Sequence, residues 1–523
     1  MATTCCAGSI HLYLLVLAWT LLVPVCLTFV LDRTTRQPAD APHLSRLLTH
    51  RHHQTPQDIG VGKDEGAIST TKLAKHTRQK NEQSYSLYVH IPYCRRRCSY
   101  CDFAIVPIGT NLSTDRGKSG FDVMDNTYRR ALLREIDSIR MNEKIELLSI
   151  YFGGGTPSLA PLETLQEVMD ALINGDDSPF VLKSDGECTI EMDPGTFDLS
   201  YLQSIKQIGF NRISLGVQSF DDSLLEIMGR VHRAKDVYST VEMIRQVFGG
   251  DANYSIDLIS GTPGLSLATW AETLSEATRL QPRPKHMSVY DLQVEEGTAF
   301  WKRYGDRRDN EVKQLNAVDC DSTPTLPSAD ECAFMYSYAS GYLRSKTYEH
   351  YEISSYAYSS DSEIMSYRSQ HNSNYWGYRS SWFAIGLGAT SRVNGVRIER
   401  PRALSDYCQW AEQLCSPKDS EPTTWMASEN DRNDDSDDEL LDLVMTRMRT
   451  SDGLDIDFVA DKFGQKCADN ILSGFQLALD LNLGNTITSE QNKLGSIRLN
   501  DPDGFLFSNN IISNVFLGLE EGS

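Results

Sequence analysis

Basic residues are in short supply in this 523-residue chain, and that shortage excludes one class of function. The chain holds 50 Lys and Arg against 71 Asp and Glu, a formal net charge of −21. Nucleic-acid binding depends on a broad basic surface, which a chain this acidic is not expected to present. We therefore predict that the protein has no nucleic-acid partner. The length allows a large core and two or more domains.

Cysteine is also scarce. Twelve cysteines in 523 residues are too few for a disulfide framework, and most of them stand alone. The exception is the segment IPYCRRRCSYCDF at 91–103, which places Cys94, Cys98 and Cys101 within eight residues. This group is the first candidate for a metal site.

Three thiolates in C-x3-C-x2-C spacing suit an iron–sulfur cluster, because soft, negatively charged sulfur is its preferred ligand. Three ligands for four irons leave one iron open for chemistry. The alternatives are a zinc site, which normally takes four ligands when it is structural, or a chance triplet. The three arginines at 95–97 have two interpretations. They lower the thiol pKa values, or they form a solvated charge run.

The first 85 residues differ from the rest in composition and in apolar periodicity. Residues 12–31 contain no charge and are long enough to cross a bilayer, so 1–31 is a signal peptide or a membrane anchor. Residues 32–85 lack apolar periodicity and are predicted to be disordered. The two parts together resemble the plastid presequence of algae with complex plastids. We predict an organellar location, a plastid rather than a mitochondrion. The alternative is a signal anchor with a flexible stalk, which would associate with a membrane through 12–31.

From residue 86 onward, short apolar β-rich runs alternate with helix-like stretches, a pattern typical of a parallel α/β sheet. The six runs lie at 86–91, 147–152, 188–192, 212–217, 254–259 and 286–292. Six units are fewer than the eight of a closed barrel. We therefore predict a partial (β/α)6 TIM-like barrel over residues 86–300.

The remainder of the chain divides by composition. A polar insertion is predicted at 301–330, an extension at 331–415 and an acidic linker at 416–438. Residues 439–523 are predicted to form a small α+β domain of winged-helix-like type. Within it, 497–519 indicates a strand, a turn at DPDG, a second strand and a helix.

A second motif, YFGGGTPS at 151–158, follows the second predicted strand. Glycines let the backbone approach a ligand closely, although a simple turn is an equal alternative. Four further polar residues follow later strands, near the ends where α/β sheets place ligands: Glu191, Gln218, Arg230 and Asp257. Each alone is more often structural, but their serial order indicates one site.

These segments, in this order, resemble the radical S-adenosylmethionine (SAM) superfamily, and within it the oxygen-independent coproporphyrinogen III oxidase-like family. YVHIPYCRRRCSYCDF, ISLGVQSF, GRVH, HYEIS and QHNSNYWGYRSSWFAIGLGA carry the resemblance, which covers 86–300, 331–400 and 439–518. It implies a [4Fe-4S] cluster on the three cysteines, whose open iron binds SAM. An electron donor reduces the cluster, which cleaves SAM to methionine and a 5′-deoxyadenosyl radical. The implied SAM contacts are Tyr88, Gly154, Gly155, Thr156, Glu191, Gln218, Arg230 and Asp257.

Two branches of this family differ in a few residues. The decarboxylating oxidase carries another cysteine two residues after the third ligand, where this chain has Phe103. The HemW heme-chaperone branch has phenylalanine there and an HNxxYW motif. His371, Asn372, Tyr375 and Trp376 match that motif. The chain thus resembles HemW, which implies binding of heme and its transfer to acceptor haemoproteins. The alternative is the oxidase, so the resemblance leaves open whether the chain is an enzyme.

The HNSNYW segment suits heme chemically. Histidine is a usual axial ligand of heme iron, and Tyr375 and Trp376 could stack on or line a porphyrin site. His371 is therefore the candidate heme ligand. A structural histidine, hydrogen-bonded in the core, is the alternative.

Overall fold

The computed structural model describes residues 84–109, 120–139, 143–305, 324–359, 367–378, 380–414, 436–487 and 495–521. The predictions for residues 1–83, and most of those for the insertion and the acidic linker, lie outside these ranges. Within them, no helix combines the length and apolar character needed to cross a membrane. The candidate span at 12–31 is not among the described residues.

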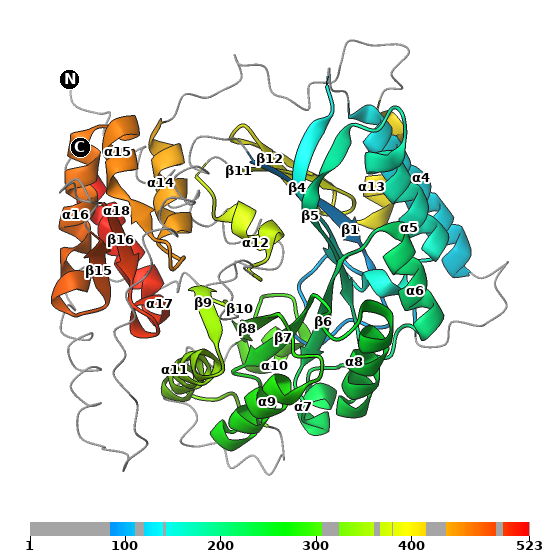
Figure 1. Cartoon of the computed structure of the whole chain (residues 1–523), viewed down its shortest axis with the longest axis horizontal. Helices are drawn as coiled ribbons and strands as arrows, with labels where there is room; N and C mark the ends of the chain where they lie inside the picture. The colour runs from blue at the N-terminus through cyan, green and yellow to red at the C-terminus, as the bar shows by residue number, and fades with distance from the viewer. Residues whose placement is uncertain are drawn as a thin grey trace. The chain divides into compact units, whose positions relative to one another are not determined.

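All six predicted strands form, and each pairs in parallel with the next (Figure 1). They are β1 (Ser84–Ile91), β4 (Ile145–Gly154), β5 (Phe180–Met192), β6 (Arg212–Gln218), β7 (Tyr254–Ser260) and β8 (His286–Asp291). Most of their residues are buried, as expected of strands covered on both faces. The predicted partial barrel is thus confirmed.

Helices follow the strands and cover one face of the sheet (Figure 1). They are α4 (Gly120–Ser138), α5 (Leu162–Met169), α6 (Leu199–Ile208), α7 (Asp222–Ile227), α8 (Ala234–Phe248) and α9 (Leu267–Arg279). Each buries one stripe; α8, for example, buries Val237, Val241 and Ile244, which share one helix face. Capping sets the boundaries of α6. Asp198 accepts a hydrogen bond at its start, and Gly209 ends it with a φ of 117°.

The extension adds strands at both edges of the barrel sheet. The helix α10 (Ala299–Tyr304) precedes it, and the elements that form it are α11 (Ala329–Ser345), β9 (Tyr348–Glu352), β10 (Ser355–Tyr358), α12 (Gln370–Tyr375), β11 (Ser380–Ile385), β12 (Thr390–Val393), β13 (Val396–Glu399) and α13 (Leu404–Gln413). β10 pairs antiparallel with β8, and β11 pairs in parallel with β1. The short helix α12 contacts β1, β4, β5 and β11 on the face opposite the helices (Figure 1).

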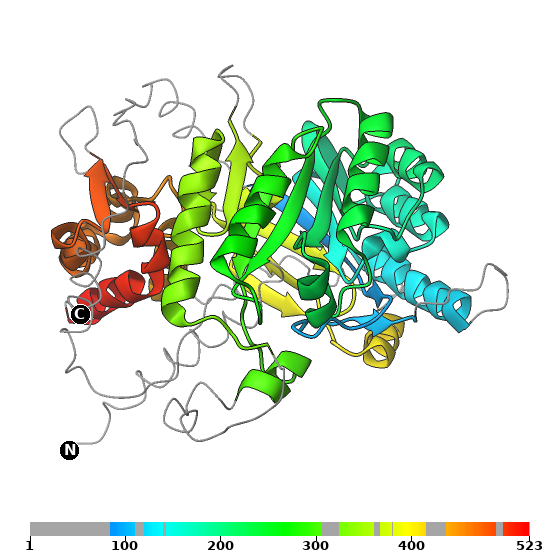
Figure 2. The ribbon, with the colours of Figure 1, turned by 90° about the horizontal axis from the view of Figure 1, so that it is seen from below.

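The C-terminal domain contains α14 (Ser436–Arg447), β14 (Leu454–Asp455), α15 (Ile456–Phe463), α16 (Gln465–Asp480), β15 (Gly484–Ile487), β16 (Ser496–Leu499), α17 (Asp503–Leu506) and α18 (Ser508–Glu521). Its antiparallel sheet, in the order β14-β16-β15, agrees with the winged-helix-like prediction. The domain lies beside α11 (Figure 2). Ser340 Oγ of α11 donates to Asp501 at 2.6 Å.

One predicted element of this domain is wrong. The residues after DPDG were expected to form a strand, but they form the helix α17. The helical turn buries Phe505 edge-on against His350, with ring centroids 5.0 Å apart. The helical turn places Phe505 against a residue more than 150 positions away in the sequence, and the local sequence pattern does not reveal such a contact.

Candidate functional site

The three clustered cysteines lie on a loop that directly follows β1. Cys94 belongs to β2 (Tyr93–Cys94), which pairs in parallel with β3 (Val106–Pro107) and closes the loop at its base. The amide of Cys101 donates to the carbonyl of Cys98 at 3.2 Å, so the second half of the loop is a tight turn. All three thiols are partly exposed and none forms a disulfide. We call this side of the barrel, at the carboxyl ends of the parallel strands, the cluster end.

Two of the three arginines of the loop join it to its surroundings, and the third bridges carbonyl groups within the loop. Arg95 donates to a carbonyl of the β5–α6 loop at 3.1 Å, and Arg96 donates to two carbonyls between α7 and α8 at 2.6 Å each. Arg97 donates to carbonyl oxygens within the loop itself. It also lowers the pKa of Cys101, although burial outweighs this effect and raises that pKa to about 11. Neither interpretation of these arginines from sequence included the fastening role.

The surroundings of the thiols fit an anionic iron–sulfur cluster. Cys98 Sγ lies 3.6 Å from Arg230 Nη1, and Cys94 Sγ lies 3.7 Å from Thr156 Oγ1. Burial, with a contribution from Asp193, raises the pKa of Cys94, so its proton must leave when iron binds. The Arg230 guanidinium and the Thr156 hydroxyl are both groups that stabilise negative sulfur.

No three or more His, Cys, Asp or Glu side chains in the described residues converge as a site for a single metal ion. In a [4Fe-4S] cluster each cysteine binds its own iron, so the three thiols need not meet at one point. The donor set is therefore compatible with a cluster.

Asp193 was missed by the sequence analysis, although it lies in the same EMDPG segment as Glu191. It accepts a hydrogen bond from Thr156 Oγ1 at 3.1 Å and a short one from Arg230. It thereby joins the two residues whose side chains contact the cysteines. A side chain at Gly216 would come within 3.1 Å of Asp193, Gln218 and Arg230, so these three polar groups gather over that glycine.

The triple glycine is explained by crowding at the end of β4. Gly154 has a φ of 111°, and a Cβ there would lie 2.4 Å from the His90 ring. The amide of Gly154 donates to Glu191 Oε2 at 3.0 Å, while those of Gly155 and Thr156 donate to backbone carbonyls at 2.8 and 2.6 Å. Since these N–H groups are used within the protein, the segment could bind a ligand's amino group only through its carbonyl oxygens.

Glu191 and two tyrosines form a connected group beside these glycines. Tyr151 donates to Glu191 Oε1 at 2.8 Å, and its ring stacks on that of Tyr88 with centroids 6.3 Å apart. Burial raises the pKa of Glu191 to about 7 and that of Asp257 to about 6. Asp257 lies inside β7 rather than at its end. Gln218 ends β6 with a left-handed φ of 65°, a conformation that is concentrated at ligand sites.

The predicted SAM residues therefore lie on consecutive strands of the barrel or on the segments that follow them, from Tyr88 on β1 to Asp257 on β7, with Arg230 between α7 and α8. Several are joined by hydrogen bonds to one another or to Asp193. Their contacts with SAM itself stay a prediction. His371 lies elsewhere, on α12, which packs inside the opposite part of the barrel.

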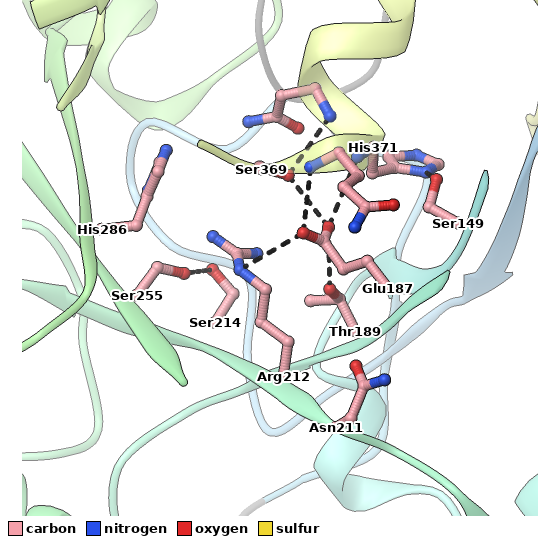
Figure 3. Close-up of polar contacts among 12 residues, drawn as sticks. Ser149, Glu187, Thr189, Asn211, Arg212, Ser214, Ser255, His286, Ser369 and His371 are labelled. Atoms are coloured by element: carbon pink, nitrogen blue, oxygen red, sulfur yellow. Dashed lines mark hydrogen bonds and ion pairs between the residues drawn. The ribbon is translucent and has the colours of Figure 1, made fainter. Parts of the chain in front are cut away.

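The side that holds α12 we call the helix end. Glu187 of β5 accepts hydrogen bonds from Ser369 Oγ and the Gln370 amide, both at 3.0 Å, and thus holds the start of α12 (Figure 3). Arg212 of β6 lies 3.7 Å from Glu187, and the two side chains are only 3% and 5% exposed, respectively. A buried ion pair at one strand end therefore fixes the helix that carries the HNxxYW motif.

Both ring nitrogens of His371 are hydrogen-bonded within the protein. Its Nδ1 lies 2.9 Å from Ser149 Oγ and its Nε2 lies 3.0 Å from Tyr375 Oη (Figure 3 shows Ser149 and His371). Burial, aided by Arg212, lowers the pKa of His371 to about 3, so the ring is neutral. The side chains of Tyr375 and Trp376 are buried too. A porphyrin could reach none of these three side chains unless α12 moved.

Comparison with known proteins places these features in a family context. The model of the radical SAM superfamily matches residues 88–277. A Synechocystis sp. protein named heme chaperone HemW is 32% identical over 451 residues, which cover 83% of this chain and 97% of that protein. The Bos taurus protein named radical S-adenosyl methionine domain-containing protein 1, mitochondrial, is 30% identical over 62% of this chain and 67% of its own length.

A solved structure supports the architecture. Coproporphyrinogen III oxidase (HemN) from Escherichia coli, described as a radical SAM enzyme, is similar with a TM-score of 0.60. The match covers 86% of this chain and 93% of that chain at 20% sequence identity. At this identity the likeness establishes the fold and carries no information on which reaction, if any, the chain performs.

Proposed function

The chain belongs to the HemW family within the radical SAM superfamily, and on that premise we propose that it is a heme chaperone, which binds heme and transfers it to acceptor haemoproteins. The observation that carries the proposal is the 32% identity to a protein named heme chaperone HemW, over 97% of that protein's length. The [4Fe-4S] cluster and SAM follow from the superfamily. Heme and the acceptor proteins belong to the proposal.

Cys94, Cys98 and Cys101 would hold the cluster at the cluster end. When bound and reduced, it supplies the single electron that radical SAM proteins use to cleave SAM. The protein's own residues prepare the site. Arg230 places a positive charge beside Cys98, and Asp193 orients Arg230. The carboxylate oxygens of Glu191 suit the ammonium group of SAM.

Phe103 distinguishes this site from that of the oxidase branch, because the resemblance implies that the oxidases have a cysteine at this position. The Phe103 side chain is 40% exposed, and its carbonyl accepts from Arg97 at 2.9 Å. The loop therefore offers no fourth thiol at that point. Only the fold favours decarboxylation of coproporphyrinogen III, which is the competing function.

His371 is the proposed heme ligand, and its burial has a consequence for affinity. To bind iron, one ring nitrogen must give up its bond to Ser149 or Tyr375, and α12 must separate from Glu187. A binding-competent state that is seldom populated weakens apparent affinity in proportion. Moderate affinity suits a chaperone, because heme has to leave for the acceptor.

We further propose that the protein works in an organelle, a plastid rather than a mitochondrion, and receives electrons from a separate donor. The basis is the composition of residues 1–85, while one relative, from Bos taurus, is named as mitochondrial. Membrane association through 12–31 is part of the same proposal. A fluorescent fusion of residues 1–83 that stayed in the cytosol would contradict it.

The decisive experiment uses the full chain reconstituted anaerobically with iron and sulfide. Heme titration followed by absorbance is expected to show one heme per chain, with weaker binding in His371→Ala. The matched control is His286→Ala, because His286 is equally buried at the start of β8. In parallel, coproporphyrinogen III is supplied with SAM and a reductant. Formation of protoporphyrinogen would overturn the chaperone proposal in favour of the oxidase.

A further inference from the structure

We propose that Tyr151 is a positioning residue that couples the SAM site at the cluster end to α12 at the helix end. SAM binding would thereby regulate access to His371. The inference rests on the proposed function, since it assigns a regulator to the proposed heme ligand. Tyr151 belongs to none of the predicted SAM or heme contacts.

Tyr151 touches both sites directly. One face of its ring stacks on His371, with centroids 4.8 Å apart and an interplanar angle of 22°. Its hydroxyl donates to Glu191 Oε1 at 2.8 Å, and Glu191 Oε2 accepts the amide of Gly154 at 3.0 Å. A single side chain thus spans the distance between a predicted SAM residue and the proposed heme ligand.

The Tyr151 side chain is closely packed against its neighbours. A Cβ on Gly153 would lie 2.8 Å from the Tyr151 ring and 3.0 Å from both Glu191 Oε1 and the Tyr88 ring. Glycine is therefore needed for these three side chains to pack as they do. In so close a packing, a shift of Glu191 cannot be absorbed locally and is passed to the Tyr151 ring.

The element that Tyr151 would bias is α12, which is held in place by hydrogen bonds to β4 and β5. Glu187 accepts from the start of the helix, and Ser149 binds the His371 ring. Tyr151 contributes the stacking surface beneath that ring. Asn374 adds bonds to Ser84 and to the Ser381 carbonyl. A short helix held by such side-chain bonds can be held or released as a unit, which is the kind of two-state element that coupling requires.

The direction of the effect follows from the charge on SAM. Its ammonium group, placed at Glu191, favours the ionised carboxylate, which is a stronger acceptor for the Tyr151 hydroxyl. Tyr151 is then fixed against His371, and α12 is held in the barrel. SAM should therefore protect α12 and weaken heme binding. Linkage requires heme to weaken SAM binding by the same factor.

The test is hydrogen exchange of the full, cluster-loaded chain without heme or reductant, with and without SAM. Amides of residues 370–376 are expected to exchange more slowly with SAM, by a factor within the usual allosteric range of about 5 to 150. In Tyr151→Phe the ring stays and the hydroxyl is lost, so SAM should still bind while its effect falls below about twofold. The matched control is Tyr254→Phe on β7, whose buried hydroxyl donates to the Pro282 carbonyl instead.

Three results would contradict the coupling or the positioning role of Tyr151, and another would reject the proposed function separately. Full SAM protection of α12 in Tyr151→Phe, or equal loss in Tyr254→Phe, would overturn the coupling. Loss of SAM binding in Tyr151→Phe would make Tyr151 part of the SAM site and overturn its positioning role. Because this readout uses no heme, failure of heme binding in a separate titration would reject the proposed function without touching the coupling.

Discussion

Two arginine–carboxylate pairs involve β5, one through Glu187 inside the strand and one through Asp193 just past its end, and the two pairs behave differently. At the helix end, Glu187 and Arg212 are 5% and 3% exposed, and the carboxylate accepts from the start of α12. At the cluster end, Asp193 and Arg230 are 28% and 9% exposed, and their partners include groups in contact with cysteines. The same chemical pair fastens a helix in one place and orients a ligand site in the other. What else each pair contacts decides its role.

The largest expected effect is the loss of the iron–sulfur cluster when a cysteine at the cluster end is replaced. Cys94→Ala, Cys98→Ala and Cys101→Ala should each reduce iron from about four atoms per chain to near zero after anaerobic reconstitution. Cys467→Ala, on the remote helix α16, is the control and should keep the full iron content. Iron and sulfide analysis with EPR of the reduced protein gives the answer. Retention of the cluster by all three variants would contradict the site.

The second prediction sets the two ion pairs against each other. Glu187→Ala should lower the free energy of unfolding by about 3 kcal/mol, because it strands the buried Arg212 charge. Asp193→Ala should cost less, about 1 kcal/mol, since Asp193 is 28% exposed and Arg230 keeps its hydrogen bond to the Gly216 carbonyl. Urea unfolding of both variants under anaerobic conditions measures the difference. An equal or reversed order would show that burial does not distinguish the two ends.

The third prediction concerns pH at the helix end. The pKa of His371 is about 3 in the fold, against about 6.5 in an unfolded chain. The unfolded state therefore takes up this proton first, and stability falls as the pH drops from 6.5 towards 3. Between pH 7 and pH 5 the wild type should lose about 2 kcal/mol more than His371→Gln.

Urea unfolding of both proteins at the two pH values measures that loss, and above pH 7 the two stabilities should run parallel. An identical loss for wild type and variant between pH 7 and pH 5 would mean that His371 is protonated within the fold. The helix end would then be more open to water than its contacts indicate.

The smallest effect is expected at Phe103, on the exposed rim of the cluster end. Phe103→Cys restores the residue implied for the oxidase branch, yet stability should change by less than about 0.5 kcal/mol because the side chain is exposed. The variant should form no protoporphyrinogen from coproporphyrinogen III. Turnover by this variant alone would show that a single thiol separates the two functions.

Local patterns allowed most of the barrel and the closeness of the three cysteines to be predicted. The apolar runs specified six strands, because parallel strands are buried on both faces. Cys94, Cys98 and Cys101 share one short loop, so their proximity depends on no other part of the fold. Glu191 and Gln218 could be placed because polar residues at the ends of parallel strands face a common edge.

Contacts between distant segments could not be predicted in this way. Nothing in the sequence indicates that Glu187 would hold a helix starting at Gln370, or that Tyr151 would stack on His371. Asp193 was within reach, since it lies two residues after Glu191. Because alternate side chains of a strand share a face, Asp193 is expected on the same side as Glu191.

The pairing of β1 with β11 also has a consequence for synthesis of the protein. β1 leads into the cysteine loop, and one of its edges is covered by β11, which begins about 300 residues later. At about 5 to 20 residues per second, a ribosome needs roughly 15 to 60 seconds to make that stretch. During this interval the edge of β1 is unpaired and open to aggregation. Iron delivered before β11 has paired with β1 would meet an incomplete support, so the late closure of this edge favours late loading of the cluster.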